Sequence, residues 1–190
     1  MKTLSITGAW LLSLASSTIP GLADEPLFKE GDMETIEQHE AGAAPRGWQV
    51  LNPQTDTPVI EAEQGQVHEG ESAMKITVGK SERFWVRSSR IRVLPNTEYE
   101  ISIAIMASQG ASPFYGVRVY ESDGGWNPPD GQPYLIQREM QKDNGREWVV
   151  KTARFQTRSN TQWLYIGLFQ QSEKQQGSVI YDSISLQPVQ

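Results

Sequence analysis

Aromatic and arginine residues stand at alternate positions within apolar stretches of this chain. In a strand with one buried face, the residues between the aliphatic ones face outward. If the aliphatic residues of 117–119 and 164–168 face a core, the outward residues are Arg118, Tyr120, Trp163 and Tyr165. Flat rings pack on the apolar faces of sugars, and guanidinium groups donate hydrogen bonds to hydroxyls. The pattern therefore predicts a ligand face suited to a carbohydrate, with plain packing as the alternative for each ring.

Three further residues extend this predicted face. Trp85 and Arg87 alternate with apolar neighbours, but Trp85 shares the register of the next apolar stretch, 91–93, and so faces outward only if a bulge intervenes. Trp126 lies in a loop, 121–137, that is rich in glycine and proline. A tryptophan in such a loop either packs back onto the domain or contacts a ligand. We expect this loop to wall one end of a binding groove.

The chain offers few residues for catalysis. His39 and His68 are its only histidines, they lack the spacing of a zinc site, and no cysteine is present. A Ser-His-Asp or Cys-His arrangement therefore has little to draw on. Glu100, Glu121 and Asp123 could supply the two carboxylates of a glycosidase, but no motif selects a pair.

Strand-like alternation dominates the chain, and helical spacing is nearly absent. The alternating stretches are 73–78, 91–93, 99–106, 117–120, 163–168 and 179–186. Turns rich in glycine, proline, aspartate and asparagine separate them. The pattern predicts an all-β sandwich or barrel with Trp48, Trp148 and Phe155 in its core. One helical turn is expected near 34–40.

Residues 1–23 have the build of a secretory leader. Lys2 gives a basic start, an apolar run covers 6–14, and small residues precede a cleavage point after Ala23. The apolar run is shorter than the ~20 residues that span a bilayer. We expect 24–190 to be a single, monomeric domain that is secreted or periplasmic in a bacterium. Without cysteine it has no disulfide framework.

The charge balance bears on the class of partner. The formal net charge is −6, from 17 Lys and Arg against 23 Asp and Glu, and removing the leader with its one charge, Lys2, leaves −7. An acidic domain repels a phosphate backbone, so we do not expect nucleic acid as a partner. The basic residues also form no run of the kind that binds an anionic membrane surface.

Six stretches carry a family resemblance that spans 31–186. They are Gly31-Asp32-Met33-Glu34, Pro45-Arg46-Gly47-Trp48, Gly70-Glu71-Ser72-Ala73-Met74-Lys75-Ile76, Val93-Leu94-Pro95-Asn96-Thr97-Glu98-Tyr99, Trp148 with Phe155-Gln156-Thr157, and Gly177-Ser178-Val179-Ile180-Tyr181-Asp182-Ser183-Ile184-Ser185-Leu186. In this order they resemble motifs of jelly-roll carbohydrate-binding modules of the xylanase-associated type, within the galactose-binding-like sandwiches. Met33 departs from an aromatic and Ser183 from an aspartate of the family pattern. The resemblance implies a β-sandwich jelly roll of two antiparallel sheets.

The resemblance also implies a structural calcium site. It makes the first and last strands neighbours and so brings together Glu34 and Asp182, whose carboxylates would bind the ion. The backbone carbonyls of Asp32 and Glu71 would add further oxygens, as a hard cation requires. In the alternative, Glu34 caps the chain or pairs with a basic side chain, and Asp182 accepts backbone donors in a turn.

Residues and resemblance together predict a non-catalytic domain that binds a polysaccharide or oligosaccharide. The resemblance implies that Trp85 is similar in position to the aromatic residue of the family's binding groove, and Arg87 to a polar neighbour of that residue. The predicted ligand residues are Trp85, Arg87, Arg118, Tyr120, Trp126, Trp163 and Tyr165. Two alternatives stay open because a fold does not fix a function. One is a module of the same fold that binds a cell-envelope protein, and the other is a small jelly-roll lyase or hydrolase.

Overall fold

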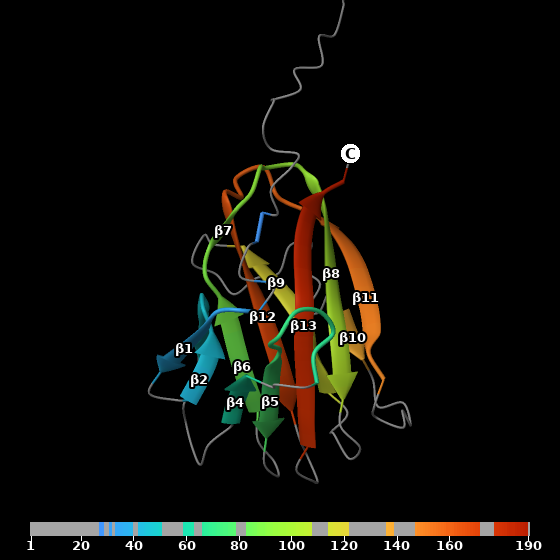
Figure 1. Ribbon diagram of the computed structural model, residues 1–190. Coiled ribbons are helices and arrows are strands. Elements are labelled where there is room, and N and C mark those ends of the chain that lie inside the picture. The colour runs from blue at the N-terminus through green and yellow to red at the C-terminus, as the bar shows by residue number, and fades with distance from the viewer. Residues whose placement is uncertain are drawn as a thin grey trace, which may run out of the picture.

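Two β-sheets pack face to face in the computed structural model of the chain (Figure 1). It describes residues 27–28, 31, 33–39, 42–50, 59–62, 66–78, 83–107, 114–121, 136–138, 147–171 and 177–189. No α-helix occurs among these residues. Accordingly, this part of the chain contains no helical segment with the length and apolarity needed to cross a bilayer.

The first sheet has seven strands in the spatial order β1-β2-β4-β5-β13-β8-β11. Their bounds are β1 Ile36–His39, β2 Gly42–Pro45, β4 Val59–Ala62, β5 Met74–Val78, β13 Gly177–Pro188, β8 Glu98–Ala107 and β11 Val149–Gln156. Neighbouring strands run antiparallel except β2 and β4, which meet in parallel at Gly42 and Ile60. The last strand of the chain thus lies inside the sheet, between β5 and β8.

The second sheet has six strands, five of them in the order β10-β9-β12-β6-β3, with β7 pairing beside β12. Their bounds are β3 Trp48–Val50, β6 Arg83–Ser88, β7 Ile91–Arg92, β9 Phe114–Glu121, β10 Ile136–Arg138 and β12 Trp163–Gln171. Its pairings are antiparallel. The prediction of an all-β sandwich of two antiparallel sheets is confirmed, with the parallel contact of β2 and β4 as its single exception among the described strands.

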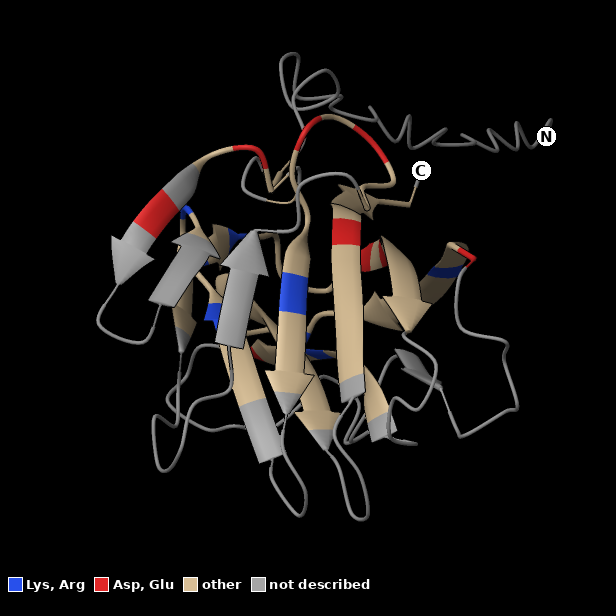
Figure 2. Ribbon diagram, turned by 60° about the horizontal axis from the view of Figure 1, so that its bottom comes forward, with Lys and Arg blue, Asp and Glu red and all other residues tan. Residues whose placement is uncertain are grey.

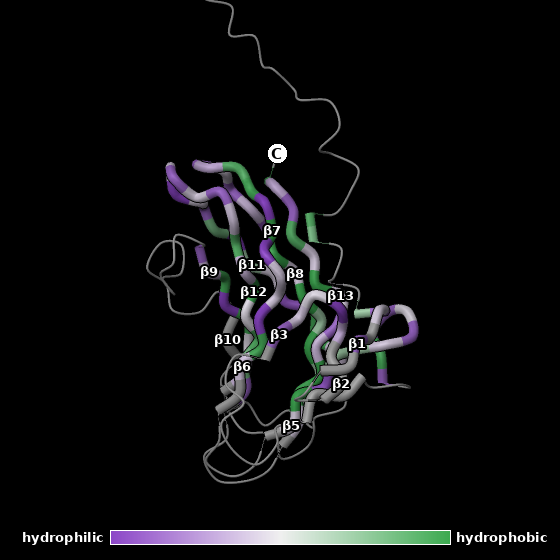
Figure 3. The backbone as a smooth tube through the Cα atoms, turned by 90° about the vertical axis from the view of Figure 1, so that its left-hand side faces the viewer, coloured by the Kyte–Doolittle hydropathy of each residue, from purple (hydrophilic) through white to green (hydrophobic). Residues whose placement is uncertain are grey.

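The core fills the space between the sheets and is built from alternate residues, as the sequence predicts. Along the strands of both sheets, hydrophobic and hydrophilic positions interchange (Figure 3). Predicted core residues that are at most 5 % exposed include Trp48, Met74, Ile76, Ile91, Val93, Tyr99, Ile101, Ile103, Ile105, Val117, Val119, Phe155, Leu164, Ile166 and Leu168. Burying these side chains supplies the main driving force for folding.

Trp148 corrects one core prediction. It is half-buried and packs in a smaller cluster with Ala73, Met106 and Ile180. β11 begins at Val149, which pairs with the inward-facing Ile105, so the residue before it reaches the outer face of the sheet. The ring of Trp148 therefore covers the outside of the seven-stranded sheet.

A bulge in β13 breaks the alternation that the sequence suggests for 179–186. Val179 and Tyr181 face the core before it, and Ile184 and Leu186 face the core after it. The pairing with β8 shifts between Asp182 and Ser185, and Ser183 has a positive φ of 50°. The extra residue re-aims the side chains at the bulge, as β-bulges do.

The expected helical turn near 34–40 is wrong. Residues Ile36–His39 form β1, which pairs antiparallel with β2. A short polar stretch carries little helical preference of its own, and the neighbouring strand satisfies its backbone groups instead.

Candidate functional site

The outer face of the six-stranded sheet gathers six of the seven predicted ligand residues. β6 contributes Trp85 and Arg87, β9 contributes Arg118 and Tyr120, and β12 contributes Trp163 and Tyr165. We call these six residues, together with Phe169 of β12, the aromatic–arginine face. The seventh prediction, Trp126, lies outside the described residues.

The strand register explains why these side chains face outward. On β6, Val86 and Ser88 are buried at 0 % and 1 % exposure, so Trp85 and Arg87 between and beside them point the other way. β6 ends at Ser88 and β7 begins at Ile91. Ser88 and Ile91 both face the core although they are three positions apart, so the strict alternation breaks between the two strands. This break lets Trp85 face outward while residues 91 and 93 face inward.

Gly167 of β12 is the central position of the face. It pairs with Arg87 on one side and with Arg118 on the other. A Cβ atom at this position would lie 2.7 Å from Tyr120 Cε2, so the Tyr120 ring occupies the space above the glycine. A larger residue at 167 would push this ring away.

The arginines of the face are stacked on its rings. The Arg87 guanidinium carbon lies 4.6 Å from the Tyr165 ring centroid. That of Arg118 lies 5.8 Å from the Trp85 ring and 5.4 Å from the Tyr120 ring. Such cation–π contacts hold a charge close to a flat apolar surface. They give the face both of the group types that a sugar ligand requires.

Exposure separates the members of the face into two roles. Trp85, Arg87, Arg118, Trp163 and Tyr165 are partly exposed and available to a ligand. Tyr120 and Phe169 are each 3 % exposed. Tyr120 accepts a hydrogen bond from Arg118 Nη1 at 3.4 Å, and Phe169 stacks on Trp85 with ring centroids 5.0 Å apart. These two buried rings position the exposed residues.

Sequence reasoning missed two members of this neighbourhood. Gln49 of β3 lies opposite Arg87, and its Oε1 accepts a hydrogen bond from Arg87 Nη2 at 3.0 Å. Phe169 continues the outward register of Trp163, Tyr165 and Gly167. The alternation of β12, extended by one step, would have identified Phe169, whereas no sequence signal placed Gln49 beside Arg87.

Three of the four predicted calcium ligands meet at one segment, the acidic loop that leads into β5. This loop, 66–73, arches over the outer face of the seven-stranded sheet and carries the exposed residues Glu69 and Glu71 (Figure 2). Both carboxylate oxygens of Glu34 accept the Glu71 amide at 3.0 Å. Gly70 has a positive φ of 71°, and a Cβ there would collide with Glu34 Oε1 at 1.8 Å. The fourth residue, Asp32, lies outside the described part of the chain.

Asp182 binds the same loop from β13. Its Oδ2 accepts the backbone amides of His68 and Glu69 at 2.7 and 3.1 Å, and its Oδ1 accepts that of Ser183 at 2.6 Å. Burial raises the pKa of this carboxyl above its ordinary value, and the three amide donors partly oppose that rise. Asp182 thus accepts backbone donors, which is the expected alternative to binding a metal. Among the described residues no three acidic, histidine or cysteine side chains gather closely enough to hold an ion.

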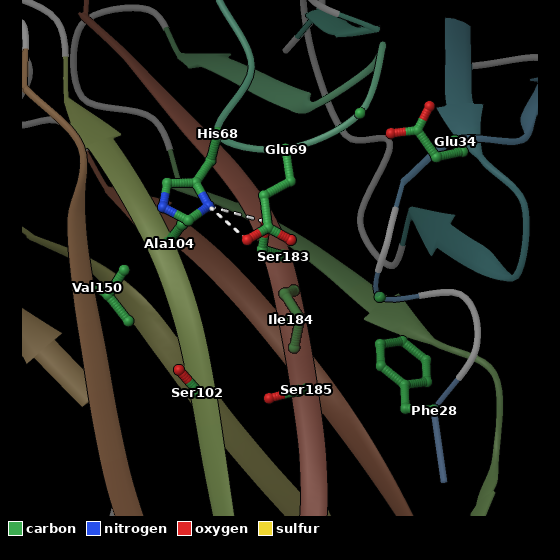
Figure 4. Close-up of a pocket in the computed structure, with 12 residues that line it drawn as sticks. Phe28, Glu34, His68, Glu69, Ser102, Ala104, Val150, Ser183, Ile184 and Ser185 are labelled. Carbon is green, nitrogen blue, oxygen red and sulfur yellow. Dashed lines mark hydrogen bonds and ion pairs between the residues drawn. The ribbon is translucent and has the colours of Figure 1, made fainter. Parts of the chain in front are cut away.

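A cavity of about 610 Å³ lies on the outer side of the seven-stranded sheet, beside this loop. Ser102, Ala104, Val150 and Ser185 line its base, with His68 and Glu69 hanging over it and Phe28 across from them (Figure 4). The side chain of His68 is half-buried here.

The contacts of His68 limit what this cavity can do chemically. Its Nδ1 lies 3.0 Å from Ser183 Oγ, and its ring contacts the Trp148 ring at 5.6 Å. A nucleophile triad would need a carboxylate hydrogen-bonded to the imidazole. The Glu69 carboxylate lies 4.0 Å from His68 Nδ1, beyond hydrogen-bond distance. Asp182, the buried carboxylate nearby, bonds the His68 backbone amide instead.

Of the three carboxylates considered for catalysis, the two that the structure describes do not face one another across a cleft. Glu100 lies on β8 of the seven-stranded sheet and forms an ion pair with Arg154 at 2.8 Å. Glu121 ends β9 in the other sheet and is 3 % exposed. It accepts hydrogen bonds from Thr161 Oγ1 and the Arg158 amide. Asp123 lies outside the described residues.

Comparison with solved structures identifies the fold. TmCBM61 in complex with β-1,4-galactotriose matches at a TM-score of 0.57 and 16 % identity, over 87 % of this chain and 99 % of that one. The CBM22-1 xylan-binding domain of Paenibacillus barcinonensis Xyn10C matches at a TM-score of 0.53 and 12 % identity, over 87 % and 96 %. The chain has the β-sandwich fold of carbohydrate-binding modules.

The same fold also occurs in enzymes. A cyclase from Fischerella sp. TAU, in complex with 4-(1H-indol-3-yl)butan-2-one, matches at a TM-score of 0.57 and 16 % identity, over 85 % of this chain and 96 % of that one. No protein-family model and no curated protein sequence matches the chain. At these identities the similarity establishes the fold, and the function has to be argued from the side chains.

Proposed function

We propose that this chain is an exported, non-catalytic domain that binds a polysaccharide or oligosaccharide on its aromatic–arginine face. The observation that carries the proposal is the convergence of Trp85, Tyr165 and Trp163 with two arginines on one outer sheet face. Partly exposed rings offer stacking surfaces, and the guanidinium groups offer planar sets of hydrogen-bond donors. Export rests on the leader-like residues 1–23.

The surface of the described residues favours a glycan over a protein partner. A protein-binding module would present a contiguous exposed apolar patch. Among the described residues the large exposed hydrophobic side chains are Leu94, in the connection between β7 and β8, and Val150, on β11. Rings interleaved with arginines suit the alternating apolar and hydroxyl surfaces of a sugar better than they suit a flat apolar partner.

A structural calcium ion forms part of the proposal. Glu34 and Asp182 would hold it, because both carboxylates already turn toward the loop 66–73 from opposite ends of the chain. A carboxylate has about four lone-pair sites. Asp182 uses three for backbone amides, which leaves acceptor capacity for one cation contact. The ion would serve folding stability and not chemistry.

Affinity electrophoresis against a panel of soluble polysaccharides tests the binding proposal. We expect retardation by at least one glycan, abolished in Trp85→Ala and Tyr165→Ala with unchanged melting temperatures. Trp148→Ala is the matched control, because it removes a partly buried tryptophan from the opposite sheet. Loss of binding in the Trp148 variant alone would move the site to the cavity beside His68. A folded protein that binds no glycan would refute the proposal.

A further inference from the structure

The aromatic–arginine face is basic on a chain that is acidic. The whole sequence has 17 basic against 23 acidic side chains. Among the described outward residues of the six-stranded sheet none is acidic, whereas Arg87 and Arg118 lie at its centre. Arg90 and Arg92 add two more guanidinium groups at one end, 5.3 and 5.8 Å from the Trp163 ring.

Arg87 and Arg118 converge over the same strand. β12 lies between their strands, and both residues pair with its Gly167. Arg87 reaches onto Tyr165 of β12, and Arg118 reaches across β12 to Trp85 of β6. The glycine between them contributes no side chain, and the Tyr120 ring lies over its backbone. Two like charges held over the same strand repel each other, and an anion bound between them would relieve the repulsion.

Arginine differs from lysine in what it binds at such a position. Its planar fork of N–H donors matches the two oxygens of a carboxylate or the oxygens of a sulfate. Arginines of this protein bind carboxylates, as Arg154 does with Glu100 at 2.8 Å and Arg158 with Glu121 at 3.1 Å. The arginines of this face lie over aromatic rings, where a sugar ring and its acid group could be bound together.

We propose that the glycan bound by this face is acidic, with carboxylate or sulfate groups on its sugars, and that Arg87 and Arg118 bind one such group beside the Tyr120 ring that covers Gly167. This inference rests on the proposed glycan-binding function and names its ligand class. Arg90 and Arg92 supply a second anion position beside Trp163. The two positions are four residues apart along β12, or roughly 13 Å at the rise of a strand. This spacing suits a polymer that carries acid groups repeatedly.

The test compares polymers that share a backbone and differ in charge. Polygalacturonate is set against its methyl ester for the carboxylate, and dextran sulfate against dextran for the sulfate. We expect one acidic polymer to bind about tenfold more tightly than its neutral counterpart, as one charge-assisted contact allows. The difference should shrink in high salt, because exposed charges are screened. The pair of polymers that shows the difference in affinity identifies the acid group as carboxylate or sulfate.

Substitutions assign the effect to the two central arginines. Arg87→Gln and Arg118→Gln should each remove most of the preference for the acidic polymer and leave weak binding of the neutral one. Arg154→Gln, on the opposite sheet, is the matched control and should bind as the native protein does. If a glutamine variant does not fold, Arg118→Lys keeps the charge without the fork and should lose part of the preference.

The outcomes separate this inference from the proposed function. Equal, salt-independent binding of acidic and neutral polymers would overturn the acidic-ligand inference and leave the glycan-binding proposal intact. Absence of binding to every glycan would overturn both. Oligo(dT) bound as tightly as the acidic glycan would also overturn the inference, because the face would then recognise any polyanion. Stacked aromatic and basic residues bind single-stranded DNA in other proteins.

Discussion

The ring of Tyr120 lies over the backbone of Gly167 on the neighbouring strand. A Cβ atom at residue 167 would approach Tyr120 Cε2 to 2.7 Å, closer than carbon atoms pack. The hydroxyl of the same ring accepts a hydrogen bond from Arg118 Nη1. The absence of a side chain at Gly167 therefore fixes the position of Tyr120 and, through it, that of Arg118.

Gly167→Ala should weaken glycan binding several-fold. The added methyl displaces the Tyr120 ring and the arginine attached to it, at a cost in stability of about 1 kcal/mol that ring movement relieves in part. Isothermal titration with the best glycan, alongside a thermal melt, measures both effects. Ser102→Ala, on the outer face of the other sheet, is the control. An alanine variant with native affinity would show that the ring position does not matter to the ligand.

The alternation of apolar and polar residues predicted most of the fold, because each strand has one buried face. The aliphatic residues of β8, β9 and β12 alternate without a break, and all of those named in advance lie in the core. β13 did not follow, because its bulge at Asp182 and Ser185 reverses the parity half-way along. A bulge depends on the partner strands, so the local sequence does not reveal it.

The candidate site was predictable where it follows from strand parity. Arg118, Trp163 and Tyr165 face outward as expected, and the break after Ser88 turned Trp85 outward too. The near-complete burial of Tyr120 and the pairing of Arg87 with Gln49 are tertiary features. The cavity beside His68 is another, because it depends on the loop 66–73 lying over residues more than 30 positions away. Periodicity within a single strand carries no such information.

Glu121→Ala should destabilise the fold by about 2 kcal/mol. Glu121 is the buried member of an ion pair whose other member, Arg158, is partly exposed. The buried carboxylate binds Thr161 Oγ1 and the Arg158 amide, and its Oε2 lies 3.1 Å from Arg158 Nη1. Urea unfolding measures the loss, and Glu98→Gln, an exposed residue of β8, is the control. A variant with native stability that had lost a polysaccharide-cleaving activity would favour the catalytic alternative.

Tyr181→Phe should cost about 1 kcal/mol near neutral pH, because the buried hydroxyl donates to the Phe169 carbonyl. That hydrogen bond spans the two sheets at 2.7 Å and ends at the residue beneath Trp85. Urea unfolding of both proteins measures the difference. The Tyr165→Phe variant, changed on the outer face, should keep native stability.

The buried hydroxyl of Tyr181 should also make the folded protein less stable in alkali. Burial raises the pKa of Tyr181 well above its ordinary value. The unfolded chain releases this proton from about pH 10 upward, whereas the folded protein retains it. The contribution is therefore complete below about pH 10 and is lost as the pH rises toward the folded pKa. Native protein should lose stability more steeply than Tyr181→Phe between about pH 10 and about pH 11, and parallel curves there would contradict this origin.

Calcium should raise the melting temperature by on the order of 10 °C at free ion ~1,000 times its dissociation constant, where the linkage free energy is about 4 kcal/mol. The ion would link two distant parts of the chain, because Glu34 precedes β1, Asp182 lies on β13, and both contact the loop 66–73. Thermal melts with calcium, with magnesium and with chelator measure the shift.

Variants decide whether these carboxylates act through a cation or only through backbone amides. Glu34→Gln and Asp182→Asn should abolish the calcium response, whereas Glu98→Gln should preserve it. If calcium and chelator give the native protein the same melting temperature, while Glu34→Gln lowers it equally in both, then Glu34 stabilises the fold only through the Glu71 amide. Asp182 would then hold the loop through the three amides that it already accepts, and the calcium proposal would fail.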